Sequence, residues 1–165
     1  MVRYRKAIFI TTYARQKPKV LATLSKHGRS KTKNDFEYLI LRRRLHWKGW
    51  EFPKGEIKFS ETERKAVIRE LKEETGLSPL KIKKFNFSGK YNYDKMFPDR
   101  PDFKGQKFSL YAAEIKKAKV KFDKYEHSGY KWVGFEKAIK MLKWPNQRKS
   151  LRIVSKWLKE KSQKA

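Results

Sequence analysis

The strongest constraint on the fold is a short acidic segment within an otherwise basic chain. The 165 residues include 44 Lys and Arg against 17 Asp and Glu, which gives a formal net charge of +27. Six of the 17 acidic residues fall between Glu56 and Glu74. Such a concentration is unexpected in a chain this basic, so the fold must give these acidic groups a specific place.

The acidic segment carries the signals of a helix over about residues 61–75. Ser60 is the expected N-cap, and Glu63, three residues further on, completes a capping box. Gly76 and Pro79 supply the stop signals. The acidic groups are therefore expected on a helix and on the turn before it.

Three glutamates share one face of that helix. At about 100° per residue, Glu70, Glu73 and Glu74 lie within an arc of about 100°. Like charges at this spacing cost about 0.2–0.5 kcal/mol per pair, and anions in the last turns oppose the helix dipole. Lysines on the same helix could compensate them. However, Ala66 and Val67 border the arc, so the trio lies beside an apolar seam, which favours a bound divalent cation instead.

The remaining pattern indicates a mixed α/β layered domain, taken as a single domain over residues 1–165. An aromatic content of 15% argues against a disordered polybasic tail. Strands are predicted at residues 3–14, 20–24, 37–44, 82–93, 107–115 and 130–133. A loop is predicted at 45–57, helices at 135–142 and 147–159 with Pro145 between them, and a frayed end at 160–165.

Composition excludes several classes of chemistry. The chain has no cysteine, so disulfides, thiolate catalysis and Cys-type metal sites are excluded. Its three histidines include no pair at ligand spacing, so a metal is expected to be held by oxygen. No run approaches the ~18 apolar residues of a membrane span, and the basic N-terminus leads into a short strand. We therefore expect a cytoplasmic protein without a membrane segment.

The high positive charge leaves two interpretations open. Self-repulsion on this scale is relieved by a polyanionic partner, and both nucleotides and RNA qualify. A lysine-rich solvated surface is the alternative. Charge alone does not decide between them, and the sequence leaves the oligomeric state open.

Residues 55–77 form a motif with fixed spacing. Gly55 is followed after five residues by Glu61 and after seven more by the run Arg69 to Leu77. This run resembles the Nudix box, G-x5-E-x7-R-E-U-x-E-E-x-G-U with U aliphatic, at every specified position. The segments 50–55, 91–93, 105–107 and 126–133 resemble the diadenosine tetraphosphate hydrolases of that family, with features shared with RNA 5′-pyrophosphohydrolases. The resemblance implies a Nudix-type α/β/α sandwich with a mixed sheet and C-terminal helices.

The resemblance also implies a metal centre. Glu70, Glu73 and Glu74 are expected to hold Mg²⁺, or Mn²⁺ in its place, and the carbonyl of Gly55 or of Lys54 is expected to join them. The reaction implied is attack of water on a phosphorus atom of a nucleoside diphosphate derivative.

Catalytic roles follow from the same resemblance. Arg69 is expected to orient Glu73, four residues further along the helix, through paired hydrogen bonds. Glu70 is the first choice for the general base. Glu126 is either a fourth acidic participant or an ordinary surface residue.

Four further residues are candidates for substrate binding. Lys54 and Lys107 are expected to bind the phosphate chain, although Lys107 could equally be one of the many surface lysines. Tyr93 is expected to stack on an adenine or to pack in the core. Trp50, together with Trp47, is either a second stacking platform or a loop anchor.

Three functions are compatible with these residues. The leading hypothesis is asymmetric hydrolysis of diadenosine tetraphosphate to ATP and AMP. The second is the same chemistry on RNA 5′ ends, with RNA held by the basic surface. The third is a basic RNA-binding module in which the Nudix fold has lost catalysis, although the intact glutamates argue against it.

Overall fold

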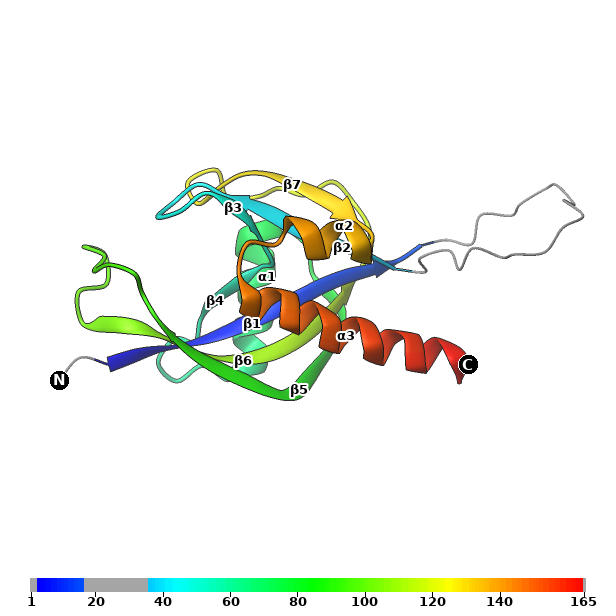
Figure 1. Cartoon of the computed structure of the whole chain (residues 1–165), viewed down its shortest axis with the longest axis horizontal. Helices are drawn as coiled ribbons and strands as arrows, with labels where there is room; N and C mark the ends of the chain where they lie inside the picture. Colours follow the sequence, from blue (N-terminus) through cyan, green and yellow to red (C-terminus); the bar gives the residue numbers. More distant parts are fainter. Residues whose placement is uncertain (1–2, 17–35, 165) are drawn as a thin grey trace, which may run out of the picture.

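A mixed sheet with helices on both faces organises the chain. The computed structural model describes residues 3–16 and 36–164, and its elements can be followed in Figure 1. The strands are β1 (Arg3–Arg15), β2 (Phe36–Arg43), β3 (Gly49–Glu51), β4 (Lys54–Glu56), β5 (Pro79–Asn92), β6 (Phe103–Ile115) and β7 (His127–Val133). The helices are α1 (Glu63–Thr75), α2 (Phe135–Met141) and α3 (Pro145–Gln163).

The sheet is divided by a fork between β1 and β2. The strand order is β3-β2-β1-β6-β5, with β4 paired to β1 and β7 to β2. Strands β1 and β6 run parallel, and the other pairs are antiparallel. Strand β1 pairs with β2 only near its C-terminal end, at residues 13–15, and nearer its start it pairs with β4, at residues 7–9. The β3–β4 segment therefore fills the space that opens where β1 and β2 separate.

Alternation along β1 creates the layers. Phe9 packs with Leu151 and Val154 of α3 on one face. Ile8, its neighbour, packs with Val67 of α1 on the other face. Successive side chains of a strand point to opposite faces, so one strand serves both cores. The predicted α/β/α sandwich is confirmed, with α3 in front of the sheet and α1 behind it in Figure 1.

The start of α1 differs from the prediction. Its N-cap is Thr62, whose side-chain hydroxyl accepts a hydrogen bond from the Lys65 amide at 3.3 Å. Ser60 has a left-handed backbone with φ of 61°, so it cannot lead directly into a right-handed helix. The expected capping box is therefore wrong, and Glu63 is the first residue of the helix.

Other boundaries also shift. The predicted loop at 45–57 contains β3 and β4, which are each too short to have a recognisable pattern. Helix α3 begins at Pro145 because proline is tolerated in the first turn, where its missing N–H has no partner to lose. The helix continues to Gln163, so residues 160–163 are not frayed. The predicted strand at 20–24 lies outside the described residues.

Among the described residues, no helix has both the length and the apolar character that crossing a membrane requires.

The N-cap assignment can be tested by mutation. We expect Thr62→Ala to lower the free energy of unfolding by about 1 kcal/mol, because an orphan amide of the first turn loses its acceptor. Ser60→Ala should change it by less than about 0.5 kcal/mol. Urea denaturation measures both variants, and the opposite ranking would contradict the assignment.

Candidate active site

Four carboxylates from separate parts of the chain surround the start of β4. Glu70 and Glu74 come from α1, Glu51 ends β3, and Glu126 immediately precedes β7. The backbone amide of Lys54 donates to Glu74 Oε2 at 3.1 Å, and the Lys54 ammonium lies 2.9 Å from Glu51 Oε2. The candidate site thus lies in the fork of the sheet, where β3, β4 and α1 meet.

Gly55 allows α1 to approach β4 closely. A Cβ atom at this position would lie 1.8 Å from the carboxyl carbon of Glu70, far inside van der Waals contact. Only glycine leaves room for that carboxylate against the strand backbone. Gly55, the first residue of the motif, is therefore required by packing, and its backbone lies next to the Glu70 carboxylate.

Arg69 connects the acidic groups of the motif. Its Nε and Nη2 atoms donate to the two oxygens of Glu61, each at 2.8 Å, in a bidentate pair. Nη1 donates to Glu70 Oε1 at 2.6 Å and to Glu73 Oε2 at 3.0 Å, and Nη2 also donates to the Glu56 carbonyl at 2.7 Å. The expected contact with Glu73 is present, but the paired hydrogen bonds go to Glu61.

The three predicted metal ligands are not equally placed. Glu70 and Glu74 are buried, with 9% and 6% of their surface exposed. The side chain of Glu73 is 53% exposed, and one of its oxygens lies 4.0 Å from the ammonium of Lys58. Glu73 therefore lies at the rim of the site, and its role as a ligand stays a prediction.

The buried carboxylates repel one another. Burial, reinforced by Glu51, Glu70 and Glu126, raises the pKa of Glu74 well above its usual value. Burial also raises the pKa of Glu70, although Arg69 opposes this shift. A cation among these groups would reverse both effects, because it favours the ionised form.

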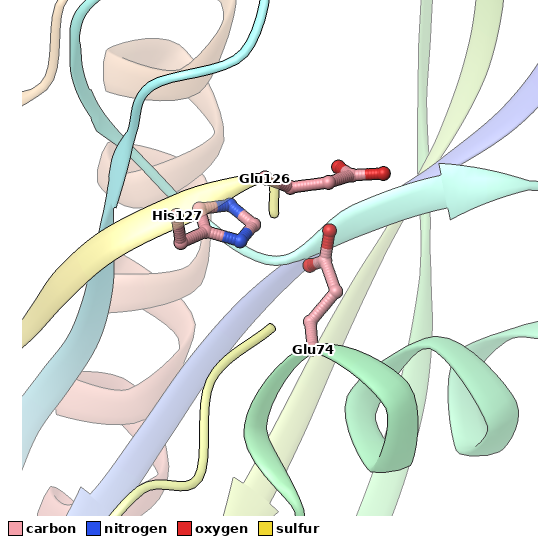
Figure 2. Close-up of side chains that lie close together, drawn as sticks. All are labelled: Glu74, Glu126 and His127. Carbon is pink, nitrogen blue, oxygen red and sulfur yellow. The ribbon is translucent and has the colours of Figure 1, made fainter. Parts of the chain in front are cut away.

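Glu126 joins the acidic centre instead of lying on an unrelated surface. Ligand atoms of Glu74, Glu126 and His127 all lie within 4.8 Å of one another. Figure 2 shows the carboxylate of Glu74 pointing from the end of α1 towards the other two residues. Glu70 is also close enough to raise the pKa of Glu74, and the carboxylate oxygens of these glutamates are the ligands that a hard divalent cation prefers.

A buried ion network behind this centre was missed by sequence reasoning. Glu51 has no exposed surface and lies 3.4 Å from Arg43 Nη1 and 3.3 Å from His127 Nε2, besides its pair with Lys54. Arg43 also pairs with Glu126. Although burial opposes it, the contacts with Lys54, His127 and Arg43 lower the pKa of Glu51 to about 2. The available signal was the position of Arg43, which shares the two-residue alternation of the buried Leu39 and Leu41 in β2.

A cavity of about 320 Å³ adjoins the carboxylates on the α3 side of the sheet. Its cationic and aromatic lining includes Arg43, Lys54, Arg100, Trp47, Tyr93 and Trp144. The rings of Trp47 and Trp144 are 5.2 Å apart, and those of Tyr93 and Phe97 are also 5.2 Å apart. The cavity therefore combines positive charge with two aromatic pairs.

The structure brings only some of the predicted substrate-binding residues to this cavity. Lys54 and Tyr93 line it, as does Trp47. Trp50 packs against the core on the opposite side of β3 from Glu51. Lys107 is exposed on β6, next to Gln106, which does line the cavity. Trp50 and Lys107 do not line the cavity, although each is the neighbour in sequence of a site residue, Glu51 or Gln106. Strand alternation turns the side chains of such neighbours to opposite faces.

A sheet between helices, with a glutamate-rich loop–helix–loop at its fork, defines the Nudix class of α/β sandwich. The model of the NUDIX domain matches residues 29–154, and the chain belongs to this family. An RNA pyrophosphohydrolase from Marinomonas sp. (strain MWYL1) is 45% identical over 49 residues, which cover 30% of this chain and 30% of that relative.

Solved structures share the fold. An Ap4A hydrolase from C. elegans in a binary complex superposes with a TM-score of 0.66 and 23% identity, covering 94% of this chain and 98% of the other. The NUDIX domain of Shewanella oneidensis NrtR, complexed with ADP ribose, gives a TM-score of 0.69 and 14% identity, covering 96% and 90%. At these identities the likeness concerns the fold.

The Glu61–Arg69 pair predicts a pH-dependent contribution to stability. The hydrogen bonds that Glu61 accepts from Arg69 lower the pKa of Glu61 to about 2, from an ordinary value of 4.5. The pair therefore stabilises the fold above about pH 4.5, and this contribution is lost as the pH falls towards 2. In chelator-treated protein, Glu61→Gln should lower the free energy of unfolding by about 2 kcal/mol at pH 7.

That difference should shrink when denaturation is repeated at pH 4 and then at pH 3. Glu160→Gln, an exposed substitution near the end of α3, is the control and should change stability by less than about 0.5 kcal/mol. A loss in Glu61→Gln that stays constant with pH would contradict the assignment.

Glu51 should be the most sensitive acidic residue of the site. Glu51→Gln keeps the side-chain shape but leaves the buried Lys54 without its counter-charge and Arg43 with only the partly exposed Glu126, so we expect a loss of about 3 kcal/mol in the free energy of unfolding. Glu37→Gln breaks the partly exposed pair with Lys117 and should cost less than about 1 kcal/mol. Equal losses in chemical denaturation would contradict the buried network.

Proposed function

We propose that this protein is a divalent-cation-dependent hydrolase of phosphoanhydride bonds in nucleotides, and that it cleaves diadenosine tetraphosphate asymmetrically to ATP and AMP. The observation that carries this proposal is the position of Lys54. Its backbone amide binds Glu74 in the acidic centre, while its side chain lines the aromatic cavity. A phosphate chain that extends from the cavity along Lys54 therefore reaches the carboxylates.

The acidic centre has the residues to hold the cation. Glu70, Glu74 and Glu126 would supply carboxylate oxygens, with Glu73 at the rim and the carbonyl of Gly55 as a further ligand. When bound, a divalent cation neutralises phosphate charge and makes water easier to deprotonate. Its binding also offsets the repulsion that raises the pKa of Glu74.

The protein's own groups supply the remaining chemistry. Arg69 holds one oxygen of Glu70, so the other oxygen is free to accept a proton from the attacking water. Because Glu70 is buried beside Arg69, its carboxylate is held in place for this transfer. The water oxygen forms the new bond to phosphorus and the bridging oxygen departs with its phosphate. Lys54 and Arg43 counter the charge of that leaving group.

The aromatic lining suits a ligand that carries nucleobases. Base–aromatic stacking is worth about 1–3 kcal/mol per base and tolerates any base. Tyr93 with Phe97 and Trp47 with Trp144 provide two such surfaces, matching a ligand that has a purine at each end. The Ap4A hydrolase from C. elegans has the same fold, so this fold is compatible with such a substrate.

RNA 5′ ends are the second candidate substrate. The observation that favours them is the match to an RNA pyrophosphohydrolase, together with the net charge of +27. A non-catalytic RNA-binding module is less consistent with the site, because Arg69 and the buried carboxylates form an intact and costly arrangement.

The test is hydrolysis with Mg²⁺ or Mn²⁺ of diadenosine tetraphosphate and triphosphorylated RNA, compared at equal concentration. We expect ATP and AMP from the dinucleotide, and a fall in kcat of about 10²–10⁴-fold in Glu70→Gln, because the base is lost. Glu160→Gln should keep wild-type turnover. Faster cleavage of RNA by orders of magnitude would favour the second candidate, and wild-type kcat in Glu70→Gln would contradict the assigned base.

A further inference from the structure

Three lysines lie side by side on neighbouring strands, outside the catalytic cavity. In the registers of the sheet, Lys6 of β1 is opposite Lys107 of β6, and Lys107 is opposite Lys90 of β5. Directly opposite residues point to the same face of a sheet. All three residues are exposed. Neighbouring strands are about 4.8 Å apart, so this lysine row places three positive charges within about 10 Å.

The row lies on the α1 side of the sheet, beyond the start of that helix. Ser109, two residues after Lys107 on the same face, donates to Glu63 in the first turn of α1 at 2.9 Å. In Figure 1 the end of the sheet where β1 begins extends past both α1 and α3, and none of the described helices covers it. This part of the face is therefore open to a large ligand.

Protection of a sheet edge does not explain the row. Lysine on an edge strand blocks unwanted pairing with other chains, and β5 is an edge strand. However, Lys6 and Lys107 belong to β1 and β6, which are paired on both sides. Like charges directly opposite each other destabilise a sheet. Lys6 and Lys107 therefore destabilise the sheet by repulsion without protecting an edge strand from unwanted pairing.

The charge of the row is not neutralised within the described parts of the chain. Among the described residues, the lysines that form ion pairs with carboxylates do not include Lys6, Lys90 or Lys107. Instead, two ammonium groups gather at Tyr4 on the same face, with Lys90 4.9 Å and Lys104 5.0 Å from its ring centre. The neighbouring residues thus concentrate positive charge instead of dispersing it.

The row adjoins the catalytic motif. The carbonyl of Lys6 accepts a hydrogen bond from the Ile57 amide at 3.0 Å. The preceding residue, Arg5, pairs with Glu56 at 2.9 Å, and the Glu56 carbonyl binds Arg69. A polyanion lying on the row can therefore continue towards the acidic centre within the same molecule.

We propose that the lysine row, with Lys104 and Tyr4, binds the phosphate backbone of single-stranded RNA. The chain of RNA would extend from this face while its phosphorylated 5′ end lies at the carboxylates. The second part rests on the proposed hydrolase activity, whereas binding of the backbone does not depend on it. Recognition through phosphates alone is independent of base sequence and sensitive to salt.

The test measures RNA binding and dinucleotide hydrolysis in the same variants. Lys6→Ala/Lys90→Ala removes both ends of the row, and Lys137→Ala/Lys156→Ala removes the same charge from exposed positions of α2 and α3. Fluorescence anisotropy with a labelled, triphosphorylated RNA of about 12 nucleotides gives Kd over a range of salt concentrations. Each double variant also carries Glu70→Gln in the binding assay, so that turnover does not interfere.

We expect the row variant to bind RNA at least about tenfold more weakly, with a slope of log K against log salt smaller by about 1.4, because two phosphate contacts are lost. The control should change Kd by less than about threefold. With Glu70 restored, both double variants should hydrolyse diadenosine tetraphosphate as the wild type does, and the thermal midpoint of the row variant should not fall.

Equal RNA affinity in the row variant and the wild type would overturn the proposal, as would an equal loss in the control. Loss of binding to anionic lipid vesicles with unchanged RNA binding would also overturn it and assign the face to a membrane surface instead. Hydrolysis of the dinucleotide without any RNA binding would overturn this inference and leave the proposed function intact. RNA binding that depends on the row, without hydrolysis of any nucleotide, would support this inference and contradict the proposed function.

Discussion

The site depends on the close approach of α1 to β4, which buries acidic groups against the strand backbone. Glycine at position 55 makes the approach sterically possible, and it places Glu70 where a side chain would otherwise stand. Burying charge without compensation is costly, so the surrounding groups have to supply cations. Arg69 does this on the outer side of the motif, and Arg43 and Lys54 do it on the inner side.

These two groups of cations leave the charges unevenly compensated. Glu61 and Glu51 are stabilised as carboxylates, whereas Glu74 is not. The acidic groups around the site therefore differ in character: Glu61, before α1, and Glu51, at the end of β3, are held in ion pairs, whereas Glu74 on α1 is not compensated. Structural pairs fix the geometry, and the uncompensated oxygens remain available for a divalent ion and for proton transfer.

Strand alternation places neighbouring residues of one strand on different surfaces of the protein. Gln106 faces the aromatic cavity, and the next residue, Lys107, faces the opposite side in the lysine row. Glu51 and Trp50 divide in the same manner between the ion network and the core. The fork between β1 and β2 then brings the cavity and the acidic centre together at Lys54, which contributes to both.

The sequence by itself determined what depends on neighbours along the chain. The spacing of the motif, the helix over most of its length, the proximity of Arg69 and Glu73, and the main strands all follow from local periodicity. Only the tertiary structure decided what depends on contacts between elements. The network at Glu51, the place of Trp144 in the cavity and the division between Glu73 and Glu74 required the register of the strands and the rotation of α1. A one-residue change of phase moves a strand side chain to the other face, and no local pattern specifies that phase relative to distant parts of the fold.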